Sequence, residues 1–215
     1  MDKKTIIITA LSILGIIIFL VGAYAMTNKP TITDFPDLKK VRTNDHIKWS
    51  PAKKQILVEY SDLQCPACQA YHVLVEELAK DKQLKDNITF IYRHYPLDAI
   101  HPNARSAAHA AEAAAIQGKF FEMHDVLFTK QNEWTSSSSP IDFYKKYAAA
   151  LKLDVAKFEK DLASNAVKQR VQDDLLEGNK YGVAGTPTFF FNGKKLDNPQ
   201  SPEAFRAVLL EGIEK

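Results

Sequence analysis

The chain has only two cysteines in 215 residues, Cys65 and Cys68, so no structural disulfide competes for them. Any sulfur chemistry therefore runs between this pair or with a sulfur of another protein. The net charge is only +2 and there is no basic stripe, so nucleic acid is not expected as a partner. No second CxxC motif and no closely spaced histidine pair completes the four ligands of a zinc site. These absences favour redox chemistry over a zinc half-site or two inert buried thiols.

The two cysteines stand in the motif Cys65-Pro66-Ala67-Cys68, between an apolar run at 56–60 and a stretch of helical periodicity at 71–78. This order predicts a strand that leads into a helix beginning at the motif. Unpaired backbone N–H groups and the helix dipole at that end favour a thiolate, so we expect Cys65 to be the nucleophile. Pro66 suits the first helical turn, and Cys68, one turn on, can attack a mixed disulfide and release the substrate.

The N-terminus carries an almost unbroken apolar run from Ile6 to about Met26, with Lys3 and Lys4 ahead of it. This run is about long enough to span a bilayer, and the lysines predict a cytoplasmic N-terminus. Ala23-Tyr24-Ala25 also resembles a cleavage site, so a removable signal peptide is the alternative. Because a signal core usually has about 7 to 15 residues, we favour an uncleaved signal-anchor. Either interpretation exports the domain to an extracytoplasmic compartment that permits disulfides.

The remaining chain divides into a linker and one α/β domain. Residues 27–44 contain two prolines and lack periodicity, which is typical of a tether, and the domain is expected over 45–215. Five strands are predicted, with a polar turn before the third and an Asn192-Gly193 hairpin between the last two: 46–49, 56–60, 88–92, 188–191 and 194–196. Between the third and fourth strands, helical spacing over about 103–181 predicts a helical insert, interrupted by a loop at 134–140.

Several further motifs accompany this order of elements. They are Glu59-Tyr60-Ser61-Asp62 before the cysteines, Tyr92-Arg93-His94-Tyr95-Pro96-Leu97, His101-Pro102-Asn103-Ala104, Gln117-Gly118-Lys119-Phe120 and Gly182-Val183-Ala184-Gly185-Thr186-Pro187-Thr188. Together they resemble the DsbA-like branch of the thioredoxin fold, in its membrane-anchored bacterial form. The resemblance implies an α/β thioredoxin fold with a helical insertion, preceded by a transmembrane helix or signal sequence.

The resemblance also implies roles for individual residues. Pro187 matches the cis-proline that faces the cysteines, and the Thr186 backbone matches the group that pairs with substrate. From the residues alone, a trans-proline at the start of a strand is an equal alternative for Pro187. Glu59 matches a buried acid beneath the inner cysteine; burial should raise its pKa and suit it to relay a proton, unless it is an edge-strand glutamate facing water. Pro66 and Ala67 are expected to contact substrate.

No histidine stands between the cysteines, where some relatives carry one. Ala67 occupies that place, which predicts a less stabilised Cys65 thiolate and more moderate oxidising power than in DsbA. The other histidines of the domain are interpreted as scattered structural residues: His72, His94, His101, His109 and His124.

The function predicted from these features is an exported thiol-disulfide oxidoreductase that forms disulfides in secreted or envelope proteins. Alternatives are an envelope thiol reductase, for example in cytochrome maturation, and a redox-inert peptide-binding module. An isomerase is disfavoured because no dimerisation module is present, and a monomer is expected. The redox-active disulfide needs no further cofactor and no metal. Expected partners are reduced secreted proteins, the membrane through the N-terminal helix, and a DsbB-like or VKOR-like membrane protein that reoxidises the pair.

Overall fold

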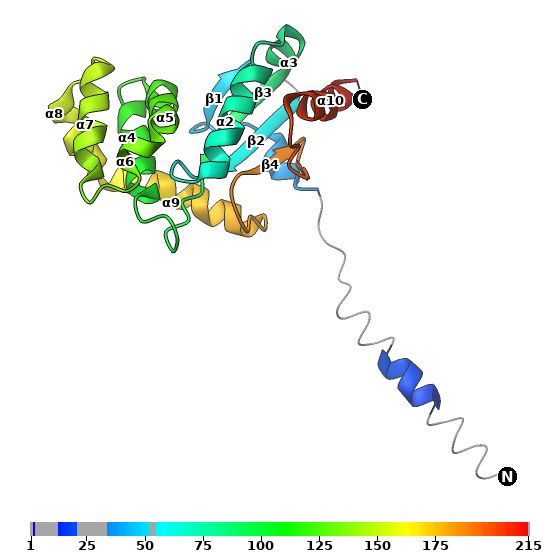
Figure 1. The fold of residues 1–215 in the computed structure, drawn as a ribbon. Coiled ribbons are helices and arrows are strands. Elements are labelled where there is room, and N and C mark those ends of the chain that lie inside the picture. Colours follow the sequence, from blue (N-terminus) through cyan, green and yellow to red (C-terminus); the bar gives the residue numbers. More distant parts are fainter. Residues whose placement is uncertain (1, 3–12, 21–33, 52–54, 215) are drawn as a thin grey trace. The chain divides into compact units, whose positions relative to one another are not determined.

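The computed structural model describes residues 2, 13–20, 34–51 and 55–214, and it divides the chain into the units Met1–Thr33 and Asp34–Lys215 (Figure 1). In the first unit, residues 13–20 are helical and exposed. Among the described residues, none of the helices has both the length and the apolar character needed to cross a membrane. The anchor expected over 1–26 falls largely outside the described residues, so it stays a prediction.

The second unit is built on a five-stranded sheet in the order β1-β3-β2-β4-β5. The strands are β1 (His46–Trp49), β2 (Gln55–Ser61), β3 (Ile88–His94), β4 (Thr188–Phe191) and β5 (Lys194–Lys195). Only β2 and β3 pair in parallel, as expected for strands joined through a crossover helix, and the other neighbours are antiparallel. The five predicted strands are therefore confirmed, and β1 lies at an edge of the sheet.

The turn between β4 and β5 is the hairpin that Asn192-Gly193 predicts. Both residues have positive φ, 50° and 77°, as a type I′ turn requires. Gly193 also lies against the chain at Phe35, whose carbonyl oxygen would be 2.6 Å from an added Cβ. Glycine is required here both by the backbone conformation and by this close approach.

Alternate residues of β2 face two different apolar layers. Leu57 faces the layer formed by α2 (Pro66–Leu78) and α10 (Pro202–Ile213), whereas Val58 faces a smaller cluster that contains Leu38. Leu38 belongs to a short 3₁₀ helix, η1 (Pro36–Lys39), and is fully buried. Residues 34–44 of the expected linker are thus part of the folded unit, because their apolar side chains cover one face of the sheet.

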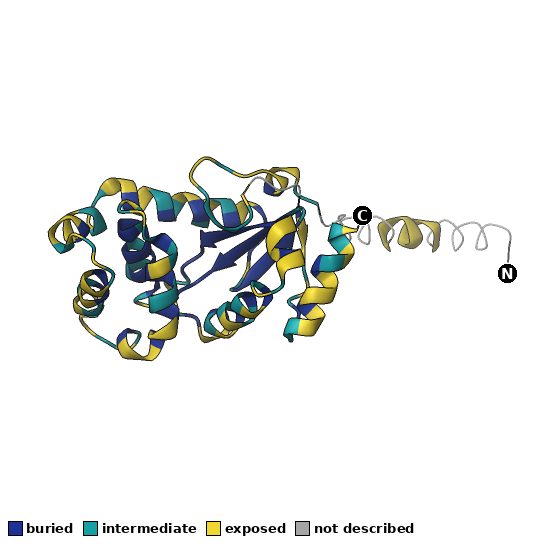
Figure 2. Cartoon of the chain, turned by 90° about the horizontal axis from the view of Figure 1, so that it is seen from above, coloured by how far each residue is buried: buried dark blue, intermediate teal, exposed yellow. Residues whose placement is uncertain are grey.

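The helical insert occupies the predicted region and packs beside the sheet, whose residues are largely buried (Figure 2). Its helices are α4 (Ala104–Ala115), α5 (Phe120–Thr129), α6 (Gln131–Trp134), α7 (Pro140–Ala150), α8 (Val155–Leu162) and α9 (Asn165–Lys180). Figure 1 shows α7 and α8 at the opposite end of this unit from α10. The prediction missed α6, and it gave a polar turn where α3 (Lys82–Asn87) forms, capped by the Asp81 carboxylate.

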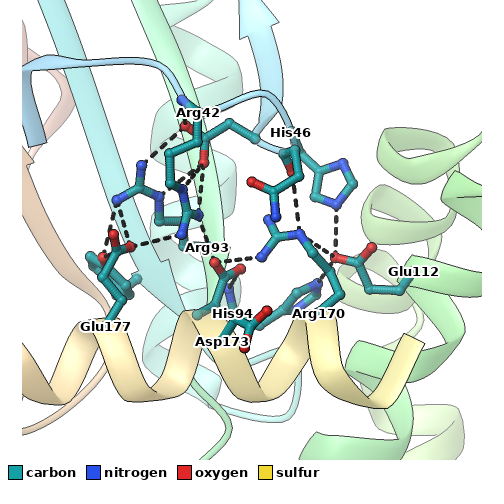
Figure 3. A network of polar contacts seen from close by, with 12 residues as sticks. Arg42, His46, Arg93, His94, Glu112, Arg170, Asp173 and Glu177 are labelled. Carbon is teal, nitrogen blue, oxygen red and sulfur yellow. Dashed lines mark hydrogen bonds and ion pairs between the residues drawn. The ribbon is translucent and has the colours of Figure 1, made fainter. Parts of the chain in front are cut away.

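A buried ion network fixes α9 to the sheet (Figure 3). The fully buried Arg93 donates to Asp45 at 3.0 Å and to Glu177 at 2.9 Å. Arg42 bonds the same two carboxylates and also Asp174, at 2.6 Å. Since these partners come from β3, from the chain before β1 and from α9, the network holds the insert in register with the strands that carry the cysteines.

Candidate functional site

The cysteine motif lies where β2 passes into α2. Cys65 is the N-cap of α2 in an extended conformation, with φ −71° and ψ 124°, and Pro66 follows in the first turn. The first turn contains no acidic side chain that would oppose a thiolate. Both cysteines are free thiols; Cys65 is 6% exposed and Cys68 is fully buried. The sequence prediction of a strand feeding a helix at the motif is confirmed.

The two thiols have opposite electrostatic environments. A hydrogen bond from the Cys68 thiol, aided by backbone N–H groups of Cys68 and Ala67, lowers the pKa of Cys65 to about 5 despite burial. Burial, reinforced by the charges of Cys65 and Glu59, raises the pKa of Cys68 well above its ordinary value. At neutral pH the reduced pair therefore holds one thiolate, on the sulfur nearer the surface, and one thiol beneath it.

Glu59 lies in β2 on the same face as Leu57 and is 3% exposed. Burial raises the pKa of Glu59 to about 7, partly offset by the Ser61 hydroxyl and increased further by the charge of Cys65. The alternative of a glutamate facing water is excluded by this burial. A carboxyl group that titrates near neutrality can both give and take a proton at neutral pH.

A loop before β4 completes the surroundings of Cys65. The Thr186-Pro187 peptide bond is cis, which confirms the geometry implied by the resemblance. In its thiol form, Cys65 donates from Sγ to the Thr186 carbonyl at 3.5 Å. Pro66 and Ala67 are exposed beside Cys65, while Pro187 is buried. The structure thus brings all the predicted site residues of the motif and the loop together; their roles in exchange stay predictions.

Two residues outside the predicted set also hold the motif in place. Gln131 of α6 donates from Nε2 to the carbonyl oxygens of Leu63 (2.9 Å) and Cys65 (3.0 Å). Asp62 bonds both cysteines through its backbone. Asp62 could have been suspected from its place three residues before Cys65, but no pattern links Gln131, which is 66 residues distant, to the site.

Histidines that are far apart in sequence meet in two clusters, which linear spacing did not reveal. In the first, Glu112 Oε1 lies 2.7 Å from His46 Nε2 and 3.1 Å from His94 Nε2 (Figure 3). Burial alone would raise the pKa of Glu112, but the hydrogen bonds from both imidazoles outweigh it and lower that pKa. Arg170 Nε lies 3.9 Å from the same oxygen.

In the second cluster, ligand atoms of His72, His124 and Asp125 lie within 4.8 Å of one another. Burial lowers the pKa of His124 to about 4, although Asp125 partly opposes this, so the imidazole is neutral at pH 7. Lys48 Nζ lies 3.3 Å from Asp125. Both clusters contain donors that suit a transition metal, yet in each a protein cation lies near the carboxylate. The expectation of no metal stays a prediction.

Curated relatives match most of this chain but only part of their own length. The Na(+)/H(+) antiporter NhaA 3 of Salinispora tropica is 38% identical over 169 residues, which are 79% of this chain and 25% of the antiporter. NhaA 1 of Mycobacterium sp. (strain KMS) is 39% identical over 159 residues, or 72% of this chain and 24% of that protein. The chain spans about a quarter of the length of these relatives. Their names therefore describe longer proteins, and this chain resembles only one part of each.

Solved structures share the fold at low sequence identity. The chain is similar to alpha-DsbA1 of Wolbachia pipientis, with a TM-score of 0.73 and 20% identity over 83% of this chain and 96% of that one. It is similar to oxidised BdbD of Bacillus subtilis, with a TM-score of 0.74 and 18% identity over 87% of this chain and all of that one. The architecture is therefore that of DsbA-like structures. A family model described as Thioredoxin matches residues 43–211, and the chain belongs to this family.

Proposed function

We propose that this protein is an exported thiol-disulfide oxidoreductase that donates its Cys65–Cys68 disulfide to reduced proteins. The observation that carries the proposal is the asymmetry of the pair: the pKa of Cys65 is lowered to about 5, whereas that of Cys68 is raised well above its usual range. A stabilised thiolate makes the reduced pair the favoured product of exchange, so the disulfide is a better oxidant.

The exchange proceeds in two steps, and in each a thiolate attack forms one disulfide bond and breaks another. A substrate thiolate attacks Cys65 Sγ, the Cys65–Cys68 bond breaks, and Cys68 leaves as a thiolate. Protonated Glu59, whose pKa of about 7 suits the task, supplies the proton that Cys68 takes up. A second substrate thiolate then attacks the substrate sulfur of the mixed disulfide, so that the substrate becomes oxidised and Cys65 leaves as its stable thiolate.

Substrate selection is proposed to rest on the backbone beside Cys65. The Thr186 carbonyl lies 3.5 Å from Cys65 Sγ and can accept a hydrogen bond from an extended peptide. Such backbone pairing has little dependence on side chains, which suits an enzyme that acts on many unfolded proteins. The exposed Pro66 and Ala67 would lie beside the substrate chain.

The acidity of Cys65 supports electron flow from substrate to this protein. A pKa of about 5 lies between those of thioredoxin (about 7) and DsbA (about 3.5), so we expect a potential between theirs, about −270 mV and about −120 mV. Structural disulfides of secreted proteins lie below about −300 mV, so donation to them is strongly downhill. The acidity supports an oxidase, although the absence of a histidine at Ala67 favours a potential more moderate than that of DsbA.

The proposed setting is the outer face of the cell membrane, with the apolar N-terminal run as an anchor. Reduced secreted proteins would be the substrates, and a DsbB-like or VKOR-like membrane protein would restore the disulfide. No cofactor is needed, because the disulfide itself accepts the two electrons.

Equilibration of the purified protein with glutathione tests the proposal. We expect a potential clearly above thioredoxin's, about −270 mV, and stoichiometric oxidation of a reduced secreted protein such as ribonuclease A. Cys65→Ser should abolish the transfer, and Cys68→Ser, which has no internal disulfide, should accumulate a mixed disulfide with glutathione at Cys65, formed by exchange with oxidised glutathione. A potential near that of thioredoxin, together with a protein found reduced in its own cell envelope, would instead favour the reductase.

A further inference from the structure

Asp62 occupies a central position between the two cysteines. Its carbonyl oxygen accepts from the Cys65 N–H at 3.1 Å, and its own N–H points at Cys68 Sγ at 3.5 Å. The backbone of this one residue therefore contacts both cysteines, Cys65 through the Asp62 carbonyl and Cys68 through the Asp62 N–H. Any shift of Asp62 changes the distance between its N–H and the inner sulfur.

The Asp62 side chain is fully buried and is held by three donors. Oδ1 accepts from the Gln64 N–H at 2.7 Å, and Oδ2 accepts from the Leu97 N–H at 2.9 Å and from His101 Nδ1 at 2.7 Å. Since a carboxylate only accepts, His101 carries a proton on Nδ1. The carboxylate thus connects the loop before α2 to the loop after β3. Of its three donors, Gln64 and Leu97 use backbone N–H groups, and His101 alone uses its side chain.

The N–H of Asp62 matters most when Cys68 carries charge. Cys68 is fully buried, and burial raises the pKa of its thiol, so a thiolate there is costly. Cys68 nevertheless leaves as a thiolate when a substrate opens the disulfide, and it attacks as a thiolate in the reverse step. A fixed N–H donor aimed at the sulfur stabilises the charge that develops in both directions, as preorganised donors do for oxyanions.

We propose that Asp62 and His101 form a positioning pair, which holds the Asp62 N–H against Cys68 Sγ and thereby accelerates opening and closing of the disulfide. This inference rests on the proposed exchange at Cys65 and Cys68. It assigns no contact with substrate to either side chain. Both act through the loop that carries the N–H.

Paired substitutions at position 101 test the proposal. In His101→Ala the third donor is lost, whereas in His101→Asn the amide N–H can occupy the place of Nδ1. The oxidised protein is mixed with excess glutathione, and the rate of disulfide opening is followed from pH 6 to pH 9. We expect His101→Ala to slow opening at least tenfold, which is about the lower limit for the loss of one hydrogen bond to a charged group, and His101→Asn to restore most of the rate.

Two controls separate positioning from loss of structure. His109→Ala removes another imidazole, on α4, whose Nε2 has no hydrogen-bond partner among the described residues, and it should open at the wild-type rate. In the reduced protein, alkylation of Cys65 by iodoacetamide involves no charge on Cys68, so His101→Ala should leave its rate within about twofold of wild type. If His101→Ala fails to fold, Asp62→Asn, which replaces one acceptor by a donor, is measured in the same way.

The inference is overturned if folded His101→Ala opens as fast as the wild type, if His101→Asn is as slow as His101→Ala, or if Cys65 alkylation falls in parallel with opening. These outcomes differ from failure of the proposed function. A wild-type protein that equilibrates at thioredoxin's potential would end the oxidase proposal. The opening rates of the wild type and the two His101 variants could still be compared, so the positioning role would still be tested.

Discussion

The hydrogen bond from Cys68 to Cys65 can be tested by removing its donor. It is the largest cause of the lowered pKa of Cys65, about 5. A hydrogen bond to a charged group contributes about 1.5–3 kcal/mol, and each pKa unit corresponds to about 1.36 kcal/mol. Cys68→Ala should therefore raise the pKa of Cys65 by about one to two units, to between roughly 6 and 7. Cys68→Ser is the matched control, because its hydroxyl keeps a donor at the same place.

Thiolate absorbance near 240 nm gives this pKa directly, and alkylation at pH 5.5 gives it independently. With a pKa of about 5, roughly three quarters of Cys65 is thiolate at pH 5.5; with a pKa of 6 to 7 the fraction is about a quarter to a thirtieth. The alkylation rate of Cys68→Ala at pH 5.5 should thus be about 3-fold to 25-fold lower. A Cys65 pKa within half a unit of wild type in Cys68→Ala, or an equal rise in Cys68→Ser, would refute the reasoning.

Three further predictions concern Glu59, Cys65 and Gly193. Burial raises the pKa of Glu59 from 4.5 to about 7, so its ionisation lowers the stability of the fold: this cost is absent below pH 4.5, grows as the pH rises and is complete above about pH 7. Glu59→Gln should therefore raise the free energy of unfolding by about 3 kcal/mol at pH 8 and by little at pH 4.5, measured with urea. The same variant should lose an inflection near pH 7 in the rate of disulfide exchange, and an unchanged profile would make the carboxyl a bystander. The lowered pKa of Cys65, about 5 instead of 9.0, stabilises the reduced form above pH 9 and loses that effect as pH falls to 5, so the melting temperature of the reduced protein should fall relative to the oxidised protein over this range. Gly193→Ala should cost about 1–2 kcal/mol because φ is 77° and the Cβ would lie 2.6 Å from the Phe35 carbonyl oxygen, whereas equal stability would show that the hairpin relaxes freely.

The parts of the fold that the sequence predicted are those with local signals. Alternation and apolar runs located every strand, and Asn192-Gly193 located the hairpin, because these patterns depend on neighbouring residues. The short helix α6 was missed because four residues are too few to show a helical period. The role of residues 34–44 was missed for a different reason: Leu38 is buried by tertiary packing, and its local composition resembles a tether.

In the candidate site, too, the features with local sequence signals were predicted and those that depend on tertiary contacts were not. The motif at Cys65 and Cys68 is compact in sequence, so its chemistry could be predicted from spacing and the helix dipole. The partnership of Asp62 with His101 spans 39 residues, and a single sequence contains no signal for such a contact. His101 was accordingly interpreted as a scattered structural residue, although its ring is hydrogen-bonded to Asp62, whose backbone contacts the Cys68 sulfur and the Cys65 N–H.

The buried ion network between the sheet and α9 has an evolutionary consequence. Loss of one partner from a buried ion pair costs about 3–5 kcal/mol, whereas replacement of the whole group by apolar side chains of similar volume can be neutral. Arg93 is fully buried between Asp45 and Glu177, so neither carboxylate can change alone without leaving the guanidinium short of a partner. Positions 42, 45, 93, 174 and 177 should therefore be inherited as a block, and descendants of this chain should either keep all five or have exchanged them together.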